Sequence, residues 1–396
     1  MMQISPETQL FIREHSSDDV RVLALQAKKY PDIDMPTAIT QIAGRKVAAE
    51  KIPSWWEIEK IWYPKHLSLE QCSSEITARY KARLLQGDSL TDLTGGFGID
   101  CSFLATGFKS ATYVERQEEL CEIAAHNFPV LNLNHINIKN EDGVTYLQVM
   151  SPVDCLFLDP ARRNEHGGKT VAISDCEPNV AELEELLLQK ANRVMIKLSP
   201  MLDLSLALKE LKHTQEIHIL SVNNECKELL ILLRQTSPAE IAIHCVNLLT
   251  KGTQEEQHLV FPREQEQRSQ CTYTDSLGNY LYEPNASLLK AGAFRSIAAA
   301  YPVRKLHPNS HLYISDSFIE NFPGRIFRIV NQCSFNKKEV KENLADLKKA
   351  NVTVRNFPAT VAELRKRIHL AEGGDTYLFA STLNNGQKVL IRCEKV

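Results

Sequence analysis

From residue 89 onward, short β-rich runs alternate with helical stretches, and this alternation restricts the possible folds more than any other feature of the sequence. The spacing predicts βαβ units and a mostly parallel sheet. The last two runs are so close together that they predict an antiparallel hairpin, because a parallel crossover needs a much longer connection. The predicted strands are "SLTDLT", "SATYVER", "HINIKN", "VDCLFLDP", "NRVMIKLSP", "EIHILSVN" and "ELLILLRQ".

Three glycines stand where the first predicted strand meets the next helix. They are Gly95, Gly96 and Gly98 in the stretch "DLTGGFGID". Glycine permits a tight turn and leaves room for a ligand close to the backbone. The spacing D-x-x-G-G-x-G differs from the G-x-G-x-x-G of dinucleotide phosphate loops, and a glycine loop alone is a weak signal. The residues at the neighbouring strand ends therefore decide its interpretation.

Acidic residues follow the second and third predicted strands. Glu115 in "YVERQ" could accept hydrogen bonds from two ribose hydroxyls, and Asp142 in "NEDG" could accept one from an adenine amino group. Each could instead be an acid in a surface loop. Their succession at strand ends favours a nucleotide cofactor. NAD is still a candidate, because proteins that bind NAD also use a carboxylate to bind a ribose.

The end of the fourth predicted strand separates these alternatives. In "VDCLFLDPARR", Asp159 and Pro160 directly follow a buried run, and the stretch resembles the D/N-P-P-x motif of nucleic-acid-base methyltransferases. The strand order likewise resembles the class I methyltransferases that use S-adenosylmethionine (SAM). The resemblance implies that the acid and the following carbonyl hold an amino group toward the methyl donor, so that catalysis is mainly positioning. Ala161 and Arg162 depart from the motif's usual second proline and aromatic residue, which leaves the target atom open.

The run "DPARR" also resembles the DPPR motif of RNA uracil-C5 methyltransferases, which attack the base through a cysteine on the next strand. In "IKLSPMLDL", Pro200 matches that family's proline, but Leu198 stands at the place of the cysteine. Without a thiolate that route has no nucleophile. We therefore expect transfer to an amino or ring nitrogen of a base.

The first loop further resembles the D-A-T-A-G-x-G-x-D loop of a ribosomal RNA guanine-N2 methyltransferase family, with Asp100 at its last position. "EQCSSEITARYKA" resembles the segment that covers the methionine end of SAM in related enzymes, although a polar helix face would look the same. Arg162, Arg163 and Lys169 could clamp a substrate phosphate or pair with Asp175 and Glu177. These resemblances imply catalytic roles for Asp159, Pro160 and Arg162, and SAM contacts for Asp92, Thr94, Gly95, Gly96, Phe97, Gly98, Glu115, Asp142, Gly143, Gln71, Ser74 and Thr77, with Ser73 and Lys81 as further candidates.

The first 87 residues predict helices without strand alternation. Ser68 is a candidate helix cap, with Gln71 completing a capping box. Trp55, Trp56 and Trp62 all lie in "PSWWEIEKIWYP". We interpret them as packing this helical region onto its neighbour, in preference to a platform for stacking bases.

The C-terminal region combines a basic charge with a compact α+β pattern. Residues 325–396 hold 14 Lys/Arg and 7 Asp/Glu, a net charge of +7, which leaves −10 for the rest of a chain whose total is −3. Its order β-α-β-α-β-β suggests a ferredoxin-like module. Together with "EGGDTYLFAST", this order resembles the THUMP-like C-terminal segment of an uncharacterised bacterial methyltransferase family, over most of the chain. That resemblance implies structured RNA (tRNA or rRNA) as partner, with phosphate contacts from Lys337, Lys338, Lys341, Lys348, Lys349, Arg355, Arg365, Lys366 and Arg367.

Before this tail, "EIAIHCVNLL" and "QHLVFP" predict two strands, and "EPNASLLKAGAFRSIAAAY" predicts one helix capped by Asn285. The expected fold class is α/β, a Rossmann-like class I methyltransferase sheet with an N-terminal helical region and C-terminal α+β (ferredoxin-like and THUMP-like) modules. The expected domains are residues 1–87 (helical), 88–238 (methyltransferase), 239–325 (small α+β) and 326–396 (basic, THUMP-like).

The ten cysteines contain no C-x-x-C pair, so we expect buried thiols and no metal site. No apolar run is long enough to span a bilayer and the first residues lack a signal pattern, so we expect a cytoplasmic protein with no membrane partner. Two alternatives to an RNA methyltransferase stay open. One is a SAM-dependent methyltransferase of a small molecule or protein, and the other is a catalytically silent RNA-binding protein.

Overall fold

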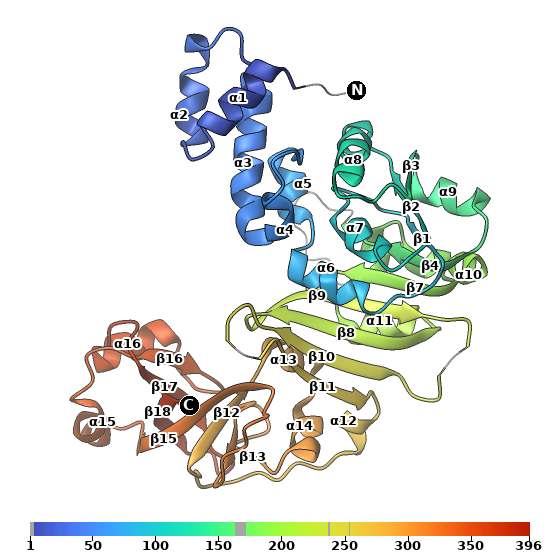
Figure 1. The fold of residues 1–396 in the computed structure, drawn as a ribbon. Coiled ribbons are helices and arrows are strands. Elements are labelled where there is room, and N and C mark those ends of the chain that lie inside the picture. Colours follow the sequence, from blue (N-terminus) through green and yellow to red (C-terminus); the bar gives the residue numbers. More distant parts are fainter. Residues whose placement is uncertain (1–3, 163–171, 237, 253) are drawn as a thin grey trace. The chain divides into compact units, whose positions relative to one another are not determined.

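The computed structural model describes residues 4–162, 172–236, 238–252 and 254–396 (Figure 1). The chain forms two compact units. Unit 1 comprises Met1–Gln215 and Leu230–Pro238, and unit 2 comprises Glu216–Leu229 and Ala239–Val396. Within the described ranges, no helix is both long and apolar enough to cross a membrane.

Unit 1 begins with a bundle of short helices, as the sequence predicts. Three of them begin at side-chain caps, which Ser5, Asp19 and Asp34 provide by accepting from backbone N–H groups. The predicted cap at Ser68 is wrong. The helix begins at His66, with Lys65 at the cap position, so Ser68 lies inside it. The helices are α1 (Pro6–Glu14), α2 (Val20–Leu25), α3 (Met35–Lys51), α4 (Pro53–Trp56), α5 (His66–Gln71) and α6 (Glu75–Ala82), with a 3₁₀ turn at Ala27–Lys29.

Two of the three tryptophans pack this helical region onto the rest of unit 1, which confirms their interpretation. Trp55 is buried and meets the ring of Phe97 edge-on, with the ring centroids 5.2 Å apart. Trp62 stacks on His126 at 3.7 Å. Trp56 differs, because it is 41% exposed and lies beside Arg45. The helical region is thus anchored to the glycine turn itself through Phe97.

The sheet of unit 1 has the predicted parallel strands in the order β7-β4-β1-β2-β3. Because the strands are parallel, their carboxyl ends meet at one edge, where ligands bind in sheets of this kind. The strands are β1 (Ser89–Asp92), β2 (Ser110–Glu115), β3 (Ile136–Asn140), β4 (Val153–Leu158) and β7 (Ala191–Leu198). The helices between and after them are α7 (Ile99–Ala105), α8 (Glu118–Val130), α9 (Gly143–Val149), α10 (Val180–Lys190) and α11 (Leu204–Glu210), and a small ribbon joins β5 (Ala161–Arg162) to β6 (Cys176–Glu177).

The predicted hairpin is also present. Asn223 and Asn224 alone connect β8 (Thr214–Val222) to β9 (Glu225–Leu233), and both have positive φ, as a tight two-residue hairpin turn requires. The complete strand order is β11-β10-β8-β9-β7-β4-β1-β2-β3. The sheet therefore continues past residue 238, since β10 (Ala242–Leu248) pairs in parallel with β8, and β11 (Glu256–Pro262) pairs antiparallel with β10.

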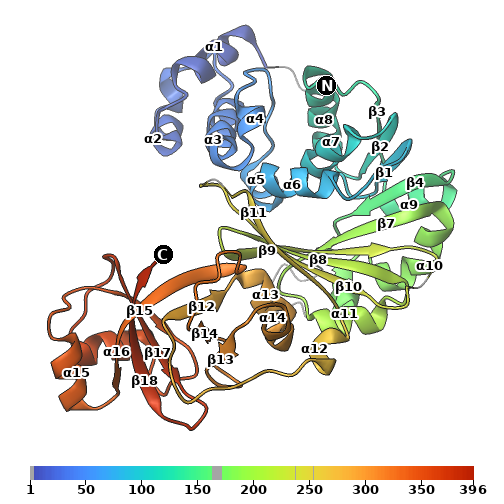
Figure 2. The ribbon, with the colours of Figure 1, turned by 60° about the horizontal axis from the view of Figure 1, so that its bottom comes forward.

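Unit 2 also contains a separate sheet, whose strands have the order β13-β14-β12-β15-β18-β17-β16 (Figure 2). Its C-terminal part shows the predicted β-α-β-α-β-β order. Helices α15 (Lys337–Leu344) and α16 (Val361–Ile368) pack Leu344 and Leu364 onto one face, against Leu378 and Leu390. The strands are β12 (Tyr280–Pro284), β13 (Arg304–Lys305), β14 (Tyr313–Ser315), β15 (Gly324–Ser334), β16 (Asn351–Val354), β17 (Thr376–Thr382) and β18 (Lys388–Lys395), and α12 spans Gln265–Arg268.

The helix predicted from "EPNASLLKAGAFRSIAAAY" is two helices. Asn285 caps the first, α13 (Ala286–Ala291), by accepting from the Leu288 N–H at 3.3 Å. Gly292 then adopts the left-handed conformation, with φ of 68°, and ends this helix before α14 (Phe294–Ala300) begins. A glycine at this position is a common helix stop.

Candidate functional site at the carboxyl ends of β1 and β4

In the glycine turn after β1, one glycine cannot be replaced without a clash and a second cannot be replaced without backbone strain. A Cβ on Gly95 would lie 2.2 Å from the ring of Tyr113. A Cβ on Gly98, where φ is +87°, would lie 3.1 Å from Phe128. Gly96 has φ of +53°, and a Cβ there would meet only the Thr94 carbonyl oxygen at 3.8 Å. The turn is thus fixed against β2 and α8, while the backbone at Gly96 keeps open space beside it.

Asp92, the last residue of β1, carries a buried carboxyl group that is only half satisfied. Its Oδ1 accepts the Thr94 N–H at 3.0 Å. Within the described part of the chain its buried Oδ2 has no hydrogen-bond partner. Burial raises the pKa of Asp92 well above its ordinary value, with smaller contributions from the nearby carboxylates of Asp100, Asp159 and Glu115. A buried polar atom without a partner is expensive, and such an atom beside an open loop fits a ligand that supplies the partner.

Glu115, at the end of β2, turns its carboxylate back onto the glycine turn. Its Oε2 accepts the Gly96 N–H at 2.9 Å, and its Oε1 accepts the Gln117 N–H at 2.9 Å. A carboxylate offers about four acceptor sites, so these contacts fix the group and leave capacity for ligand hydroxyls. Asp142 is exposed and caps α9, where its Oδ1 accepts from Val144 and Thr145.

The other predicted cofactor residues lie in different surroundings. Phe97 is a core residue packed on Trp55 and Tyr63. Gly143 lies so close to the Leu93 carbonyl that a Cβ would be 2.1 Å from its oxygen. Gln71 is exposed at the end of α5, and Ser74 precedes α6, with its hydroxyl 3.3 Å from that of buried Thr77.

A cluster of two buried lysines, the buried Asp100 and the partly exposed Asp159 joins α6, α7, β7 and the end of β4. Lys81, at the end of α6, lies 3.1 Å from Asp100 Oδ1 and donates to Ser73 Oγ at 3.0 Å. Ser73 in turn donates to Asp100 Oδ2 at 2.7 Å. Burial alone would raise the pKa of Asp100, but Lys81 and Lys197 outweigh it and hold that pKa below its ordinary value. The segment "EQCSSEITARYKA" is therefore tied to the glycine turn through Asp100.

Asp159 is held at the end of β4 from two sides. Its backbone N–H donates to Thr94 Oγ1 at 2.6 Å, and its Oδ2 pairs with Lys197 Nζ. Lys197 also lies 3.4 Å from Asp100 Oδ2, so it links the two carboxylates. Pro160 is buried, and the backbone of Arg162 pairs with Cys176 in the β5–β6 ribbon. The Arg162 side chain, Arg163 and Lys169 lie outside the described residues.

Lys197 was not among the residues expected from the sequence. The signal was present, because a lysine interrupts the otherwise apolar run "VMIKL" of a buried strand. Lysine is rarely buried unless it is paired, so its position in such a run indicates a partner inside the fold. Which carboxylate pairs with it depends on the neighbouring strand and could not be read from the sequence.

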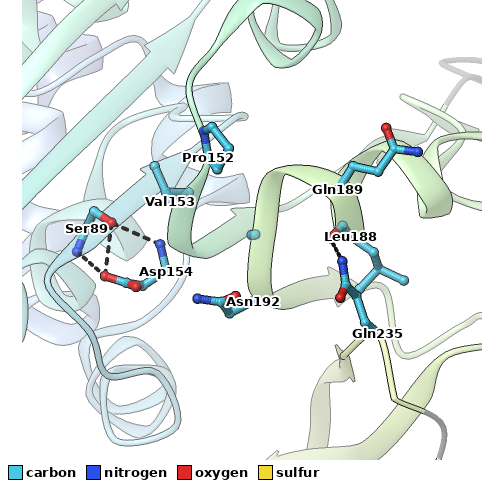
Figure 3. Close-up of a pocket in the computed structure, with 9 residues that line it drawn as sticks. Ser89, Pro152, Val153, Asp154, Leu188, Gln189, Asn192 and Gln235 are labelled. Carbon is cyan, nitrogen blue, oxygen red and sulfur yellow. Dashed lines mark hydrogen bonds between the residues drawn. The ribbon is translucent and has the colours of Figure 1, made fainter.

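An open hollow of about 220 Å³ lies at the opposite end of these strands (Figure 3). Its lining includes Ser89, Val153 and Ala191, which are the first residues of β1, β4 and β7. The side chains gathered at the carboxyl ends are not part of it. Among the described residues, the group with metal-ligand spacing, Glu216, His218 and His244, belongs to unit 2 and is likewise not part of the carboxyl-end cluster.

Comparison with known proteins places this geometry in a family. A predicted methyltransferase from Porphyromonas gingivalis W83, known from its crystal structure, is 34% identical to this chain over 100% of both chains, with a TM-score of 0.88. The chain belongs to this methyltransferase family. A ferredoxin-like domain model matches residues 280–323, and a THUMP domain-like model matches residues 324–395. The expected fold class is thereby confirmed.

More distant structures match only part of the chain. An rRNA methylase from Streptococcus thermophilus is 14% identical over 40% of this chain and 94% of its own, with a TM-score of 0.30. A predicted methyltransferase from Streptococcus mutans, in complex with SAH, is 13% identical over 40% of this chain and 96% of its own, also at 0.30. No curated protein matches the sequence.

Proposed function

We propose that this protein is a SAM-dependent methyltransferase that modifies a base nitrogen in structured RNA, tRNA or ribosomal RNA, in the cytoplasm. One observation carries the proposal. Asp159 is held from two sides, by Thr94 of the glycine turn and by Lys197 of β7. A carboxylate fixed directly beside a ligand-binding turn is suited to orienting a second reactant there.

The residues around the turn fit SAM. Asp92 offers a buried, unpartnered oxygen, Gly96 leaves open space beside its backbone, and Glu115 offers a fixed carboxylate that can accept from ribose hydroxyls. Asp142 stands at the end of β3, where it could accept from an adenine amino group. Bound SAM would supply an already activated methyl group, so the protein needs no strong base.

Asp159 acts by positioning. Lys197 occupies Oδ2, and a carboxylate retains further acceptor sites. Asp159 and the Pro160 carbonyl would accept the N–H groups of an exocyclic amine. This arrangement leaves the nitrogen lone pair directed at the methyl donor. Thr94 links the cofactor region to the substrate region, because it belongs to the glycine turn and its hydroxyl oxygen accepts the Asp159 N–H.

A covalent route through cysteine has no support near this cluster. Leu198, at the end of β7, is a buried core residue. Burial raises the pKa of the Cys72 thiol to about 11, and the nearby charges of Asp100 and Lys197 have smaller effects on it. At pH 7 such a thiol is almost entirely protonated and therefore a weak nucleophile. Transfer to nitrogen needs no such nucleophile.

The surface of α15 and its surroundings favours RNA as substrate. Lys337, Lys338 and Lys341 are exposed on α15, and Lys348, Lys349 and Lys366 are exposed nearby in the same module. Across the described chain none of these six lysines forms an ion pair, whereas Arg355 is paired with Glu283 and Arg365 with Glu372. Unpaired lysines are available for phosphates.

The test is transfer of labelled methyl groups from SAM to total RNA from a strain lacking the gene, followed by mass spectrometry of the nucleosides. Wild-type protein should label one nucleoside on nitrogen. Asp159→Asn should lower the rate by about 10²–10³-fold, in the range typical for loss of a group that positions reactants.

Asp154→Asn is the matched control, because Asp154 lies at the other end of the same strand and should leave the rate unchanged. SAM binding measured by calorimetry separates the alternatives. SAM binding without RNA labelling would indicate a small-molecule or protein acceptor. RNA binding without SAM binding would make the protein a silent RNA binder and overturn the proposal.

A further inference from the structure

Three histidines and a glutamate lie together on one face of β8, β10 and β11, in a part of unit 2 that the proposed methyl transfer does not use. Glu216 and His218 are two residues apart on β8, so their side chains share a face. His244 on β10 is directly opposite His218 in the parallel register. His258 on β11 pairs with Val246, which places it diagonally from His244.

The nitrogen and oxygen atoms of this group converge. His218 Nε2 lies 3.3 Å from Glu216 Oε2, and His244 Nε2 lies 4.0 Å from the same oxygen. One ligand atom from each of these three residues lies within 4.8 Å of the others. The His218 side chain is 2% exposed and that of Glu216 is 37% exposed, so the group is buried on one side and reachable on the other.

His258 and Glu256 complete the arrangement from β11. His258 Nε2 lies 3.3 Å from His244 Nδ1, and His258 Nδ1 lies 3.8 Å from Glu256 Oε1. If His244 donates its Nδ1–H to His258, its Nε2 lone pair faces Glu216. Metal-binding histidines commonly donate their second nitrogen to such an outer partner, which fixes the tautomer.

We propose that Glu216, His218 and His244 form a binding site for a divalent transition-metal ion of the zinc type, with His258 as an outer-shell partner. Tetrahedral zinc with bonds of about 2.0–2.2 Å places its ligand atoms about 3.3–3.5 Å apart. The distances of 3.3 and 4.0 Å are close to this value. The rings of His218 and His244 are stacked, with their centroids 4.1 Å apart, so binding requires the imidazoles to rotate until both Nε2 lone pairs face one ion. Two imidazoles and one carboxylate favour zinc-type ions over magnesium or calcium, which prefer oxygen ligands.

The site joins strands that are distant in sequence, so a bound ion would cross-link β8 to β10 and stabilise unit 2. The cysteine spacing could not indicate it, because the ligands are brought together by strand register. It also departs from the expectation of no metal site.

The experiment is calorimetric titration of the metal-stripped full-length protein with Zn²⁺, together with visible spectroscopy using Co²⁺. Wild-type protein should bind one ion, give the intense absorption of four-coordinate Co²⁺, and gain several degrees in Tm when Zn²⁺ is added. His218→Gln and His244→Gln should each weaken binding at least 100-fold. Glu216→Gln should weaken it at least tenfold, and His258→Gln by about 10–100-fold as an outer partner.

His66→Gln is the matched control, because His66 and Glu70 form an exposed two-ligand pair in unit 1, with the ring nitrogen 3.6 Å from the carboxylate. Binding should be unchanged in this variant. Unchanged affinity in His244→Gln, or binding without 1:1 stoichiometry, would show adventitious ions only and overturn the site. His218 is buried, so the metal-free Tm of each variant is measured first. The more exposed Glu216 and His258 still test the site if His218→Gln does not fold.

Discussion

The two ends of β1 and β4 carry similar polar residues in opposite situations. At the amino ends, Asp154 Oδ2 accepts the N–H groups of Asp88 and Ser89 at 2.8 and 2.9 Å and the Ser89 hydroxyl at 3.0 Å. Ser89 Oγ in turn accepts the Asp154 N–H at 2.9 Å. At the carboxyl ends, Asp92 keeps a buried oxygen without a partner in the described chain.

The difference separates polar residues that complete the fold from those that are prepared for a ligand. At the amino ends the hydrogen bonds are made within the sheet, and little remains for another molecule. At the carboxyl ends the protein buries two lysines with Asp100 and leaves Asp92 partly unsatisfied. Proteins retain such costly arrangements mainly at functional sites. The hollow of Figure 3 lies at the amino ends, where the polar residues already bond to one another. The presence of a hollow therefore does not by itself locate the reactive site.

The largest effect on stability is expected for Lys81→Met. Lys81 is fully buried, and its loss leaves the buried Asp100 with Lys197 as its other cation. Breaking a buried ion pair costs about 3–5 kcal/mol, and we expect the lower end because Lys197 remains. Urea unfolding followed by tryptophan fluorescence measures this cost, since all three tryptophans lie in unit 1.

Two further variants control this measurement. Lys109→Met removes an exposed lysine whose partner Asp88 is also exposed, and the unfolding midpoint should not change. Adding Asp100→Asn to Lys81→Met should recover part of the loss, because the uncompensated charge is then removed. A cost below about 1 kcal/mol for Lys81→Met alone would contradict the buried pair.

Asp92→Asn should have a smaller effect that depends on pH. Burial raises the pKa of Asp92 above its ordinary value of 3.8, so the folded protein holds this proton more tightly than the unfolded chain. The stability from Asp92 is therefore fully present below its ordinary pKa and is lost as pH rises through the raised value. Asparagine does not ionise, so the variant should gain stability relative to wild type as pH rises from 5 to 9.

The same variant should weaken SAM binding at least tenfold, or about 1.4 kcal/mol, if Asp92 Oδ2 contacts the cofactor. Parallel urea titrations across this pH range and calorimetry with SAM measure the two effects. A stability difference that does not change with pH would show that folding does not raise the pKa of the Asp92 carboxyl group.

The sheet could be predicted because its cause is local. Alternating β-rich and helical runs located β1 to β4, β7 and the β8–β9 hairpin, and two asparagines suffice to close that hairpin. The errors concern where helices begin and end, because a nearby residue determined the boundary. The chain enters α5 at His66 before Ser68 can cap it, and Gly292 ends α13 inside a run that otherwise favours a helix.

The candidate site could be predicted only in part. Asp92, Glu115 and Asp159 were identifiable because they follow strands whose carboxyl ends must meet. The roles of Lys81 and Lys197 depend on the packing of α6 and β7 around Asp100, which no short-range pattern encodes. The histidines of unit 2 likewise meet only through the register of β8 with β10.

Asp154→Asn is the smallest and most discriminating change. Its carboxylate is partly exposed, and the N–H groups of Asp88 and Ser89 lower its pKa. The stability that Asp154 contributes is therefore present above the ordinary carboxyl pKa and is lost as pH falls through the lowered value. Asparagine keeps one acceptor but weakens these bonds, at a cost of about 0.5–1 kcal/mol at pH 7. The unfolding midpoint should fall slightly, while SAM affinity and the rate of methyl transfer stay within twofold of wild type. A tenfold loss of activity in a folded variant would show that the amino end also contributes to the reaction, and the division between the two ends of the strands would have to be abandoned.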